Sequence, residues 1–312
     1  MALLAPQLVE SKPNTAQAAA ASARSMTNDC GVTARGIPSC GAFAGGAYGS
    51  NSDVGPWEKS MGGKIGVRRT YWGASQVAGA VRTAKADAAA GRVPWMSFKT
   101  PYSWTDMAAG RGDAWARDLA TKMRSAGGPV WVAVHHEPEG DGDVLAWKRM
   151  QERLAPIMRR AASNLGYSVI LMGYHQFGTT SSTYSMDRIW PDTKVDVAGF
   201  DIYELYGEKK SGKPMDTRWK DFIGNYFTKI EKWVAANDVK AWGLAETGYS
   251  DPAAEKKPNW PSLTYQAMVD HGGVAFAYFN TGLHNKVANW QLNTSAKKNG
   301  FATLVRSAPR LR

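Results

Sequence analysis

No stretch of this 312-residue chain approaches the roughly 18 consecutive apolar residues that a membrane-spanning helix requires, although 44% of its residues are hydrophobic. We therefore expect no membrane insertion. Residues 1–6 are too short for the apolar core of a signal peptide, and no basic segment precedes them. The sequence thus predicts either a cytoplasmic protein or one that reaches the outside without a conventional signal peptide, for example within a virion.

Cysteine is scarce as well, because Cys30 and Cys40 are the only two. Their spacing is compatible with a small disulfide loop in an oxidising environment but does not establish one. No further ligand residues lie nearby, so the pair does not form a zinc site. His135 and His136 cannot easily bind one ion either, since adjacent residues of a strand point to opposite faces. We expect neither a metal nor another cofactor.

Acidic residues are fewer than basic ones, 27 against 38, which gives a net charge of +11. The basic residues do not gather in one stripe with aromatic residues between them, as a nucleic-acid-binding surface would. We therefore expect no nucleic-acid partner, and a mildly basic surface instead suits acidic envelopes or glycans. Basic pairs occur at five separate places: Arg68-Arg69, Arg159-Arg160, Lys209-Lys210, Lys256-Lys257 and Lys297-Lys298.

Large apolar residues are rare in residues 1–38, which are rich in Ala, Ser, Asn and Thr. We interpret this segment as an arm or linker, with a possible role in attachment to other virion tail proteins. Residues 39–312 read as one domain in which apolar β-runs alternate with helical patterns. The predicted strands are 41–47, 64–71, 93–99, 129–136, 168–173, 195–203, 239–246 and 273–280. The predicted helices include 75–90, 113–126, 144–165, 219–236 and 262–271.

Near-continuous apolar strands are typical of parallel sheets buried on both faces. Eight of them in alternation with helices predict an α/β fold of the (β/α)8 TIM-barrel type. A doubly wound open sheet is the alternative, but it would normally carry a glycine-rich phosphate loop after the first strand. The glycines at 45–49 have the wrong spacing and precede no helix cap.

Two glutamates close apolar strand patterns, Glu137 after 130–136 and Glu246 at the end of 240–246. Catalytic groups of a (β/α)8 barrel lie at the C-terminal ends of its strands. Retaining glycoside hydrolysis needs one protonated carboxyl group and one ionised carboxylate, about 5–5.5 Å apart. We interpret Glu137 as the acid/base and Glu246 as the nucleophile. The structural alternative is that each glutamate only caps a helix or pairs with an arginine.

The same residues resemble glycoside hydrolase family 26, which contains β-mannanases of the retaining (β/α)8 clan. The resemblance spans about residues 40–305 and rests on His136-Glu137, residues 195–203, residues 245–248, and residues 277–280 followed by Trp290. It implies that His136 lines the site beside the acid and that Tyr203 hydrogen-bonds the nucleophile. Pro138-Glu139 stands where typical mannanases have Met-Asn, which argues against a mannan substrate. The general organisation also resembles tail-associated hydrolases of bacteriophages that infect actinobacteria.

Further candidates for substrate binding follow the predicted strands. Thirteen tryptophans are many for this length, and aromatic faces stack on sugars. Most of the tryptophans fall within strands or helices, where they pack. Trp72, Trp104 and Trp290 instead follow strands at the end that bears the glutamates, and we expect two of the three to contact sugar.

Arg68, Lys99 and Asp201 also lie near strand ends, where each could bind a hydroxyl group or form a structural ion pair. The sequence therefore predicts a retaining endo-glycoside hydrolase that acts on a β-linked polysaccharide of a bacterial cell envelope. The alternative function is a non-catalytic glycan-binding or structural tail protein that kept the barrel.

Overall fold

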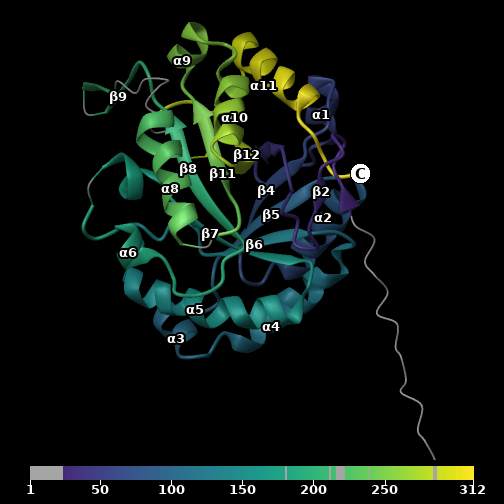
Figure 1. Ribbon diagram of the computed structural model, residues 1–312, viewed down its shortest axis with the longest axis vertical. Coiled ribbons are helices and arrows are strands. Elements are labelled where there is room, and N and C mark those ends of the chain that lie inside the picture. Colours follow the sequence, from purple (N-terminus) through teal and green to yellow (C-terminus); the bar gives the residue numbers. More distant parts are fainter. Residues whose placement is uncertain (1–23, 180, 211, 216–221, 238, 284–286) are drawn as a thin grey trace, which may run out of the picture.

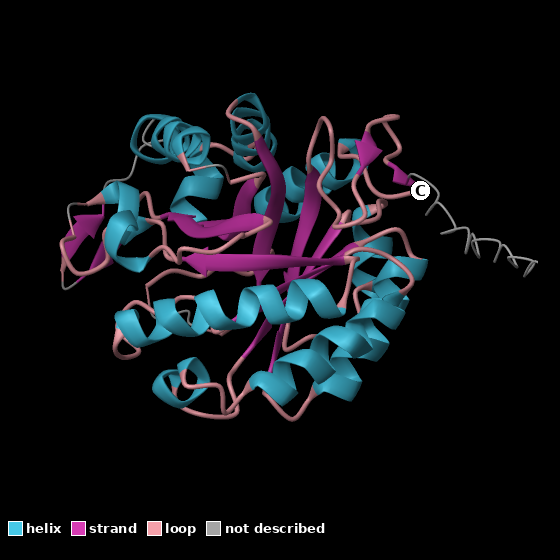
Figure 2. Ribbon diagram, turned by 60° about the horizontal axis from the view of Figure 1, so that its bottom comes forward, coloured by secondary structure: helices cyan, strands magenta, loops and turns pink. Residues whose placement is uncertain are grey.

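The computed structural model describes residues 24–179, 181–210, 212–215, 222–237, 239–283 and 287–312. Its centre is a closed barrel of eight parallel strands in sequence order, with helices around the outside (Figure 2). The predicted (β/α)8 barrel is confirmed. The barrel strands are β3 (Phe43–Tyr48), β4 (Val67–Trp72), β5 (Val93–Phe98), β6 (Val130–Val134), β7 (Leu165–Leu171), β8 (Val197–Glu204), β11 (Trp242–Tyr249) and β12 (Gly273–Asn280).

The strands read as continuous apolar runs because both of their faces are buried. In β6 every residue is buried, and the faces alternate as a strand requires. Val130, Val132 and Val134 pack outward in the layer shared with the helices. Trp131 and Ala133 pack inward with the barrel interior. Neither face of this strand therefore carries a stripe of polar residues exposed to water.

Helices cover the barrel where the sequence predicted them, four of them shorter than predicted and the last beginning two residues earlier. These are α2 (Val77–Ala89), α4 (Asp113–Met123), α5 (Val144–Ala161), α8 (Thr228–Ala236) and α10 (Trp260–Asp270). The predicted helix 219–236 differs most, because η3 (Phe222–Phe227) is a π-helix and residues 219–221 lie outside the described residues. Further elements are α1 (Gly55–Met61), α3 (Trp104–Ala108), η1 (Arg124–Ala126), η2 (Tyr174–Gly178), α6 (Met186–Ile189), α9 (Asp251–Lys256) and α11 (Ser295–Ser307).

The first and last parts of the chain meet at the barrel. Helix α11 lies beside α1 (Figure 1), where Phe301 stacks on Trp57 with ring centres 5.5 Å apart. Two small antiparallel pairs complete the secondary structure of the described residues. They are β1 (Arg24–Ser25) with β2 (Gly31–Val32), and β9 (Glu208–Lys210) with β10 (Lys213–Met215).

The segment 24–38 closes the N-terminal end of the barrel, although the sequence suggested an arm there. Met26 is fully buried, bridges to Leu311, and shares the interior cluster with Trp131. Cys30 and Cys40 form a disulfide with their Cα atoms 5.5 Å apart. This segment is therefore part of the barrel unit, and residues 1–23 of the predicted arm lie outside the described residues. Within the described ranges, no helix is long and apolar enough to cross a membrane.

Candidate active site

Glu246 points into the barrel because strand β11 contains a bulge. Leu244 pairs with Phe200 of β8, whereas Glu246, two residues later, pairs with the very next residue, Asp201. Leu244 and Phe200 both pack outward, so strict alternation would turn Glu246 outward as well. The extra residue, Ala245, faces the interior and shifts the register. A bulge that re-aims a side chain in this way is common next to active sites.

Four side chains surround the carboxylate of Glu246. The hydroxyl of Tyr71 donates to Oε1 and the hydroxyl of Tyr203 donates to Oε2, each at 2.7 Å. The guanidinium of Arg69 lies 3.6 Å from Oε1, and Nε2 of His136 lies 3.8 Å from the same oxygen. Burial raises the pKa of both tyrosines well above the usual value, and the charge of Glu246 raises it further. Both tyrosines thus remain protonated and act as hydrogen-bond donors to Glu246.

The position of Tyr71 is fixed by Asn51, from the loop after β3. The side-chain amide of Asn51 donates to the carbonyl of Tyr71 at 2.6 Å, and its Oδ1 accepts from the Tyr71 amide at 3.0 Å. Asn51 has a φ of 60°, a left-handed conformation that asparagine tolerates better than most residues. Strands β3 and β4 share two register pairs. Near the site, the two hydrogen bonds between the Asn51 side chain and the Tyr71 backbone replace further pairing between the strands.

Glu137 stands on a left-handed turn that follows β6. His135 and Glu137 have φ values of 53° and 48°, a backbone conformation that costs of order 1–3 kcal/mol and clusters at functional sites. The amide of Glu137 donates to the carbonyl of Ile170 at 3.0 Å, which anchors the turn to β7. Burial, followed by the charges of Glu246 and Glu139, raises the pKa of Glu137 to about 8. Glu137 therefore holds a proton at neutral pH.

Asp201 is a third carboxyl group in the same interior. It is 3% exposed, and burial raises its pKa well above the usual value, with further contributions from Glu246 and Glu137. The positive charge of Arg69 acts in the opposite direction on both Asp201 and Glu137. Three carboxyl groups thus share the surroundings of one guanidinium, and burial together with the charge of Glu246 raises the pKa of both Glu137 and Asp201.

An aromatic wall lies beside Glu246. The ring of Trp290 is 4.5 Å from that of Tyr203, and Phe279 packs edge-on against both Tyr203 and Tyr71. A Cβ atom on Gly248 would lie 3.3 Å from Trp290 and 3.5 Å from Tyr203. A larger side chain at Gly248 would therefore press on this wall. Trp290, predicted from the sequence, thus joins Tyr203 and Glu246.

Lys99 and Trp104 both contact His135, two residues before Glu137. Nε2 of His135 lies 3.0 Å from Asp141 and 3.3 Å from Nζ of Lys99, and the ring of Trp104 stands edge-on to His135 at 4.7 Å. Burial lowers the pKa of His135, although Asp141 opposes the shift. In the described part of the chain, no group of three or more His, Cys, Asp or Glu side chains is placed to hold a metal ion.

Two predicted residues do not reach this group. Arg68 points to the helix layer, where its guanidinium lies 3.2 Å from Asp87 of α2 and donates to the carbonyl of Ser52 at 2.8 Å. Trp72 also packs outward, because a Cβ atom on Gly79 of α2 would lie 3.1 Å from its ring. The structure therefore assigns the structural alternative to Arg68, and Trp72 packs against a helix.

Several site residues were not predicted from the sequence, namely Arg69, Tyr71, Asn51 and Glu139. Arg69 and Tyr71 share one face of β4, while Arg68 and Trp72 share the other. Both faces thus offer an arginine and an aromatic residue, and their order alone does not say which is inside. The sequence signal that could have identified Arg69 and Tyr71 is a tyrosine two residues after an arginine on a predicted barrel strand.

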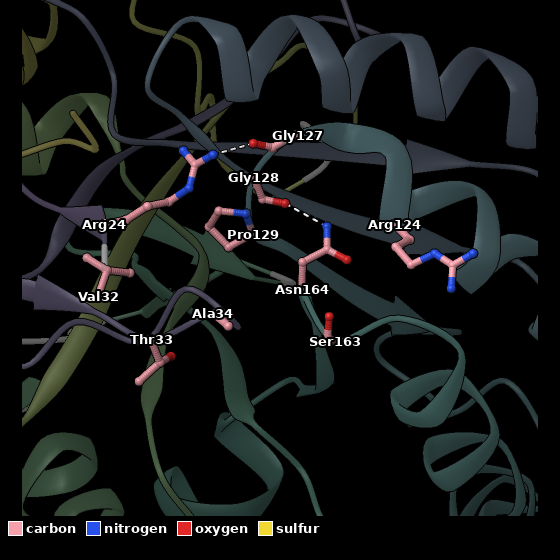
Figure 3. Close-up of a pocket in the computed structure, with 10 residues that line it drawn as sticks. All are labelled: Arg24, Val32, Thr33, Ala34, Arg124, Gly127, Gly128, Pro129, Ser163 and Asn164. Carbon is pink, nitrogen blue, oxygen red and sulfur yellow. Dashed lines mark hydrogen bonds between the residues drawn. The ribbon is translucent and has the colours of Figure 1, made fainter. Parts of the chain in front are cut away.

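A separate hollow of about 260 Å³ lies at the other end of the barrel (Figure 3). Gly128 and Pro129 of its lining directly precede β6, and Asn164 directly precedes β7. Arg24 reaches across to donate to the carbonyl of Gly127. Catalytic groups of a (β/α)8 barrel lie at the C-terminal ends of the strands, so this hollow is not part of the candidate site.

No protein-family model matches the chain, and no curated protein matches it significantly. Solved structures share its fold. A family 26 glycoside hydrolase from a Muricauda species is 15% identical, with a TM-score of 0.55 over 83% of this chain and 88% of its own. A ruminal family 26 endo-β-1,4-mannanase is 12% identical, with a TM-score of 0.53 over 84% of this chain and 63% of its own.

A family 5 broad-specificity endoglucanase from Clostridium longisporum is 12% identical, with a TM-score of 0.59 over 86% of this chain and 97% of its own. At these identities the likeness establishes the (β/α)8 fold. What the site does must be argued from its own side chains.

Proposed function

We propose that this protein is a retaining endo-glycoside hydrolase that cleaves a β-linked polysaccharide. The observation that carries the proposal is the unequal surroundings of two carboxyl groups at the C-terminal end of one barrel. Glu246 accepts two tyrosine hydroxyls and faces Arg69, whereas the pKa of Glu137 is raised to about 8. One group is ready to attack, and the other is ready to give a proton.

In the first step, Glu137 donates its proton to the glycosidic oxygen while a carboxylate oxygen of Glu246 attacks the anomeric carbon. The glycosidic bond breaks, the shortened chain leaves as an alcohol, and a glycosyl ester forms on Glu246. In the second step, ionised Glu137 takes a proton from water, and the resulting hydroxide attacks the same carbon. The ester bond breaks and both glutamates return to their starting states.

The surrounding residues supply orientation and charge. Tyr71 and Tyr203 hold the two oxygens of Glu246 in a fixed plane, and Arg69 stabilises the negative charge of this carboxylate. Trp290, 4.5 Å from Tyr203, offers an aromatic face for the sugar that Glu246 attacks. Lys99 and Trp104, next to His135, lie on the acid side, where the leaving part of the polysaccharide would extend.

We propose a family 26-like enzyme acting on a cell-envelope polysaccharide. Support for a β-linked substrate comes from the described activities of the similar structures, a β-1,4-mannanase and an endoglucanase. The net charge of +11 suits an acidic envelope. Pro138-Glu139 departs from the mannanase pattern, which argues for a glycan other than mannan.

We also propose that the protein works outside a cell or on a virion tail, with residues 1–23 as the attachment segment. The disulfide between Cys30 and Cys40 supports an oxidising location. Detection of the protein in purified virions, and its loss from them when residues 1–23 are deleted, would test this placement.

The function is tested by reducing-end release from mannans, glucans and actinobacterial envelope polysaccharides. We expect one glycan to be cut by the wild type, with a loss of about 1,000-fold or more in Glu246→Gln. Glu255→Gln, an exposed glutamate of α9, is the matched control and should keep full activity. Anomeric NMR of the first product should show retention.

A fully inverted product would contradict the retaining mechanism. Absence of release from every glycan, with glycan binding retained by both wild type and Glu246→Gln, would favour the non-catalytic binding protein.

A further inference from the structure

Glu139 lies two residues after the acid and is only 6% exposed. Its Oε1 accepts from the backbone amide of Met172 at 3.1 Å and from Nε2 of Gln176 at 2.7 Å. The same Gln176 nitrogen donates to the carbonyl of Tyr184 at 3.0 Å. Glu139 thus ties the loop after β6 to the segment after β7, and no step proposed above uses it.

The hydrogen bond between Glu139 and Met172 continues the pairing of β6 with β7 beyond the point where their backbone register ends. Strands β6 and β7 remain in register up to Ala133 and Ser168. Beyond that point, the amide of Glu137 still donates to the carbonyl of Ile170, and the carboxylate of Glu139 then supplies the acceptor for Met172. The loop carrying the acid is therefore fastened to β7 at two points, on either side of Pro138.

We infer that Glu139 is a positioning residue for Glu137: its carboxylate fastens the acid-bearing loop to the β7–η2 segment, and its negative charge favours a proton on Glu137. The inference rests on the proposed role of Glu137 as acid/base. Burial, the larger effect, raises the pKa of Glu139, and the two N–H donors on Oε1 act in the opposite direction and favour its ionised form.

The titratable and charged groups that face Glu137 come from four elements. Glu246 of β11, Asp201 of β8 and Arg69 of β4 surround it, and Glu139 approaches from its own loop. After burial, Glu246 and then Glu139 are the main causes that raise the pKa of Glu137, while Arg69 lowers it. Removal of the Glu139 charge should therefore release the proton of Glu137 at a lower pH.

The test is the pH dependence of kcat/KM in Glu139→Gln, which keeps an oxygen acceptor of the same reach. In the wild type we expect the basic limb near pH 8. In Glu139→Gln we expect that limb to move down by roughly 0.5–1 pH unit. Asp118→Asn, which removes one exposed carboxylate of α4 that pairs with Lys122, should leave the limb unchanged.

Glu139→Asp separates the positioning effect of Glu139 from the effect of its negative charge. It keeps the carboxylate but shortens its reach by one methylene group. We expect kcat to fall about tenfold from the lost positioning, with the basic limb close to that of the wild type. This variant also keeps the inference testable if Glu139→Gln fails to fold.

A second readout needs no substrate. The free energy of unfolding is compared between wild type and Glu137→Gln from pH 5 to 9, and again with Glu139→Gln in both. The wild type should lose stability relative to Glu137→Gln as the pH rises from the unfolded-state pKa of a glutamate, about 4.3, toward the pKa of Glu137. Without the Glu139 charge, this loss should end at a lower pH and be smaller in total. If the pH dependence of the free energy of unfolding changes in this way but no glycan is hydrolysed, the effect of Glu139 on the proton of Glu137 is supported and the proposed function is not.

An unmoved basic limb together with an unmoved stability curve in folded Glu139→Gln would overturn the electrostatic role. Unchanged kcat in Glu139→Asp would overturn the positioning role.

Discussion

Asp201 and Glu246 stand opposite each other in the register of β8 and β11, so two carboxyl groups share the inner wall of the barrel. The hydroxyls of Tyr71 and Tyr203 donate to Glu246, and the guanidinium of Arg69 lies beside it. Asp201 is more deeply buried. Adjacent carboxyl groups in a dry interior cannot both ionise without a large cost. Because the two tyrosine donors face Glu246 and the pKa of Asp201 is raised, we expect Asp201 to be the group of this pair that keeps its proton.

Substitution of Asp201 by asparagine tests this assignment, because asparagine resembles a protonated aspartic acid in shape. The pKa of Asp201 is raised in the folded protein, so the folded state binds the proton more tightly than the unfolded chain. The wild type must then lose stability as the pH rises from about 4 toward the folded pKa. We expect Asp201→Asn to be more stable than the wild type at pH 8, with the difference shrinking toward pH 4. Chemical denaturation at several pH values measures this.

A constant difference between the two proteins at all pH values would mean that Asp201 is already ionised. Activity provides a second check. Since asparagine preserves the neutral state, kcat at pH 7 should stay within about tenfold of the wild type.

The two tyrosine hydroxyls on Glu246 should each matter to catalysis. Tyr71→Phe and Tyr203→Phe each remove one donor to a charged oxygen, an interaction of about 1.5–3 kcal/mol. We expect each to lower kcat by about 10- to 100-fold. Tyr265→Phe is the control, because its hydroxyl donates to the carbonyl of Ala42 instead. Steady-state kinetics that show less than a twofold loss in both site variants would refute the role of these hydroxyls.

Adjacent arginines on β4 should have separable effects. Arg69→Met removes the cation beside Glu246 and should lower kcat by about 100-fold or more. Arg68→Met removes a partner of Asp87 in the helix layer, where Arg92 remains 2.9 Å away. It should lower the free energy of unfolding by about 2 kcal/mol and leave kcat of the folded enzyme nearly unchanged. The reverse pattern in kinetics and denaturation would show that the faces of β4 were misassigned.

This pair also shows where prediction from the sequence stops. The strand β12 is found where the apolar run predicts it, and the ends of the other barrel strands differ from the prediction by at most three residues. Apolar runs locate such strands because both faces are buried. On β4, however, both faces carry an arginine and an aromatic residue, so periodicity cannot say which arginine faces the interior.

The ends of β6 and β11 were missed for a related reason. The predicted strand 129–136 stops at Val134 because His135 adopts a left-handed conformation. The bulge at Ala245 turns Glu246 inward against strict alternation. Both features depend on contacts with neighbouring strands, which a local pattern does not contain. The identity of the two glutamates could be predicted, but not the tyrosines and the arginine around them.

The loop that carries Trp290 should depend on a buried lysine. Lys297 of α11 is fully buried, donates to the carbonyl of Asn289, and lies 2.6 Å from Asp251. The hydroxyl of Tyr278 holds the next carbonyl, that of Trp290, at 2.9 Å. We expect Lys297→Met to raise KM by about tenfold, with a smaller change in kcat, because Trp290 loses its support.

The neighbouring Lys298 is exposed, so Lys298→Met removes the same charge from the same helix without touching this loop. An equal rise of KM in both variants would point to surface charge and away from the position of Trp290.

The disulfide between Cys30 and Cys40 should stabilise the closed base of the barrel without affecting the site. It closes a short loop whose residues pack with Met26 and Leu311 across the N-terminal ends of the strands. A loop of this length is worth about 2–3 kcal/mol through restriction of the unfolded chain. We expect Cys30→Ser combined with Cys40→Ser to lower Tm and to keep kcat, since the glutamates lie at the other end of the barrel. A reductant should lower Tm of the wild type to that of the variant and leave the variant unchanged, because the chain has no other cysteine. If the reductant lowers the variant's Tm equally, the loss comes from a general effect of the reductant and the disulfide contributes nothing to the base.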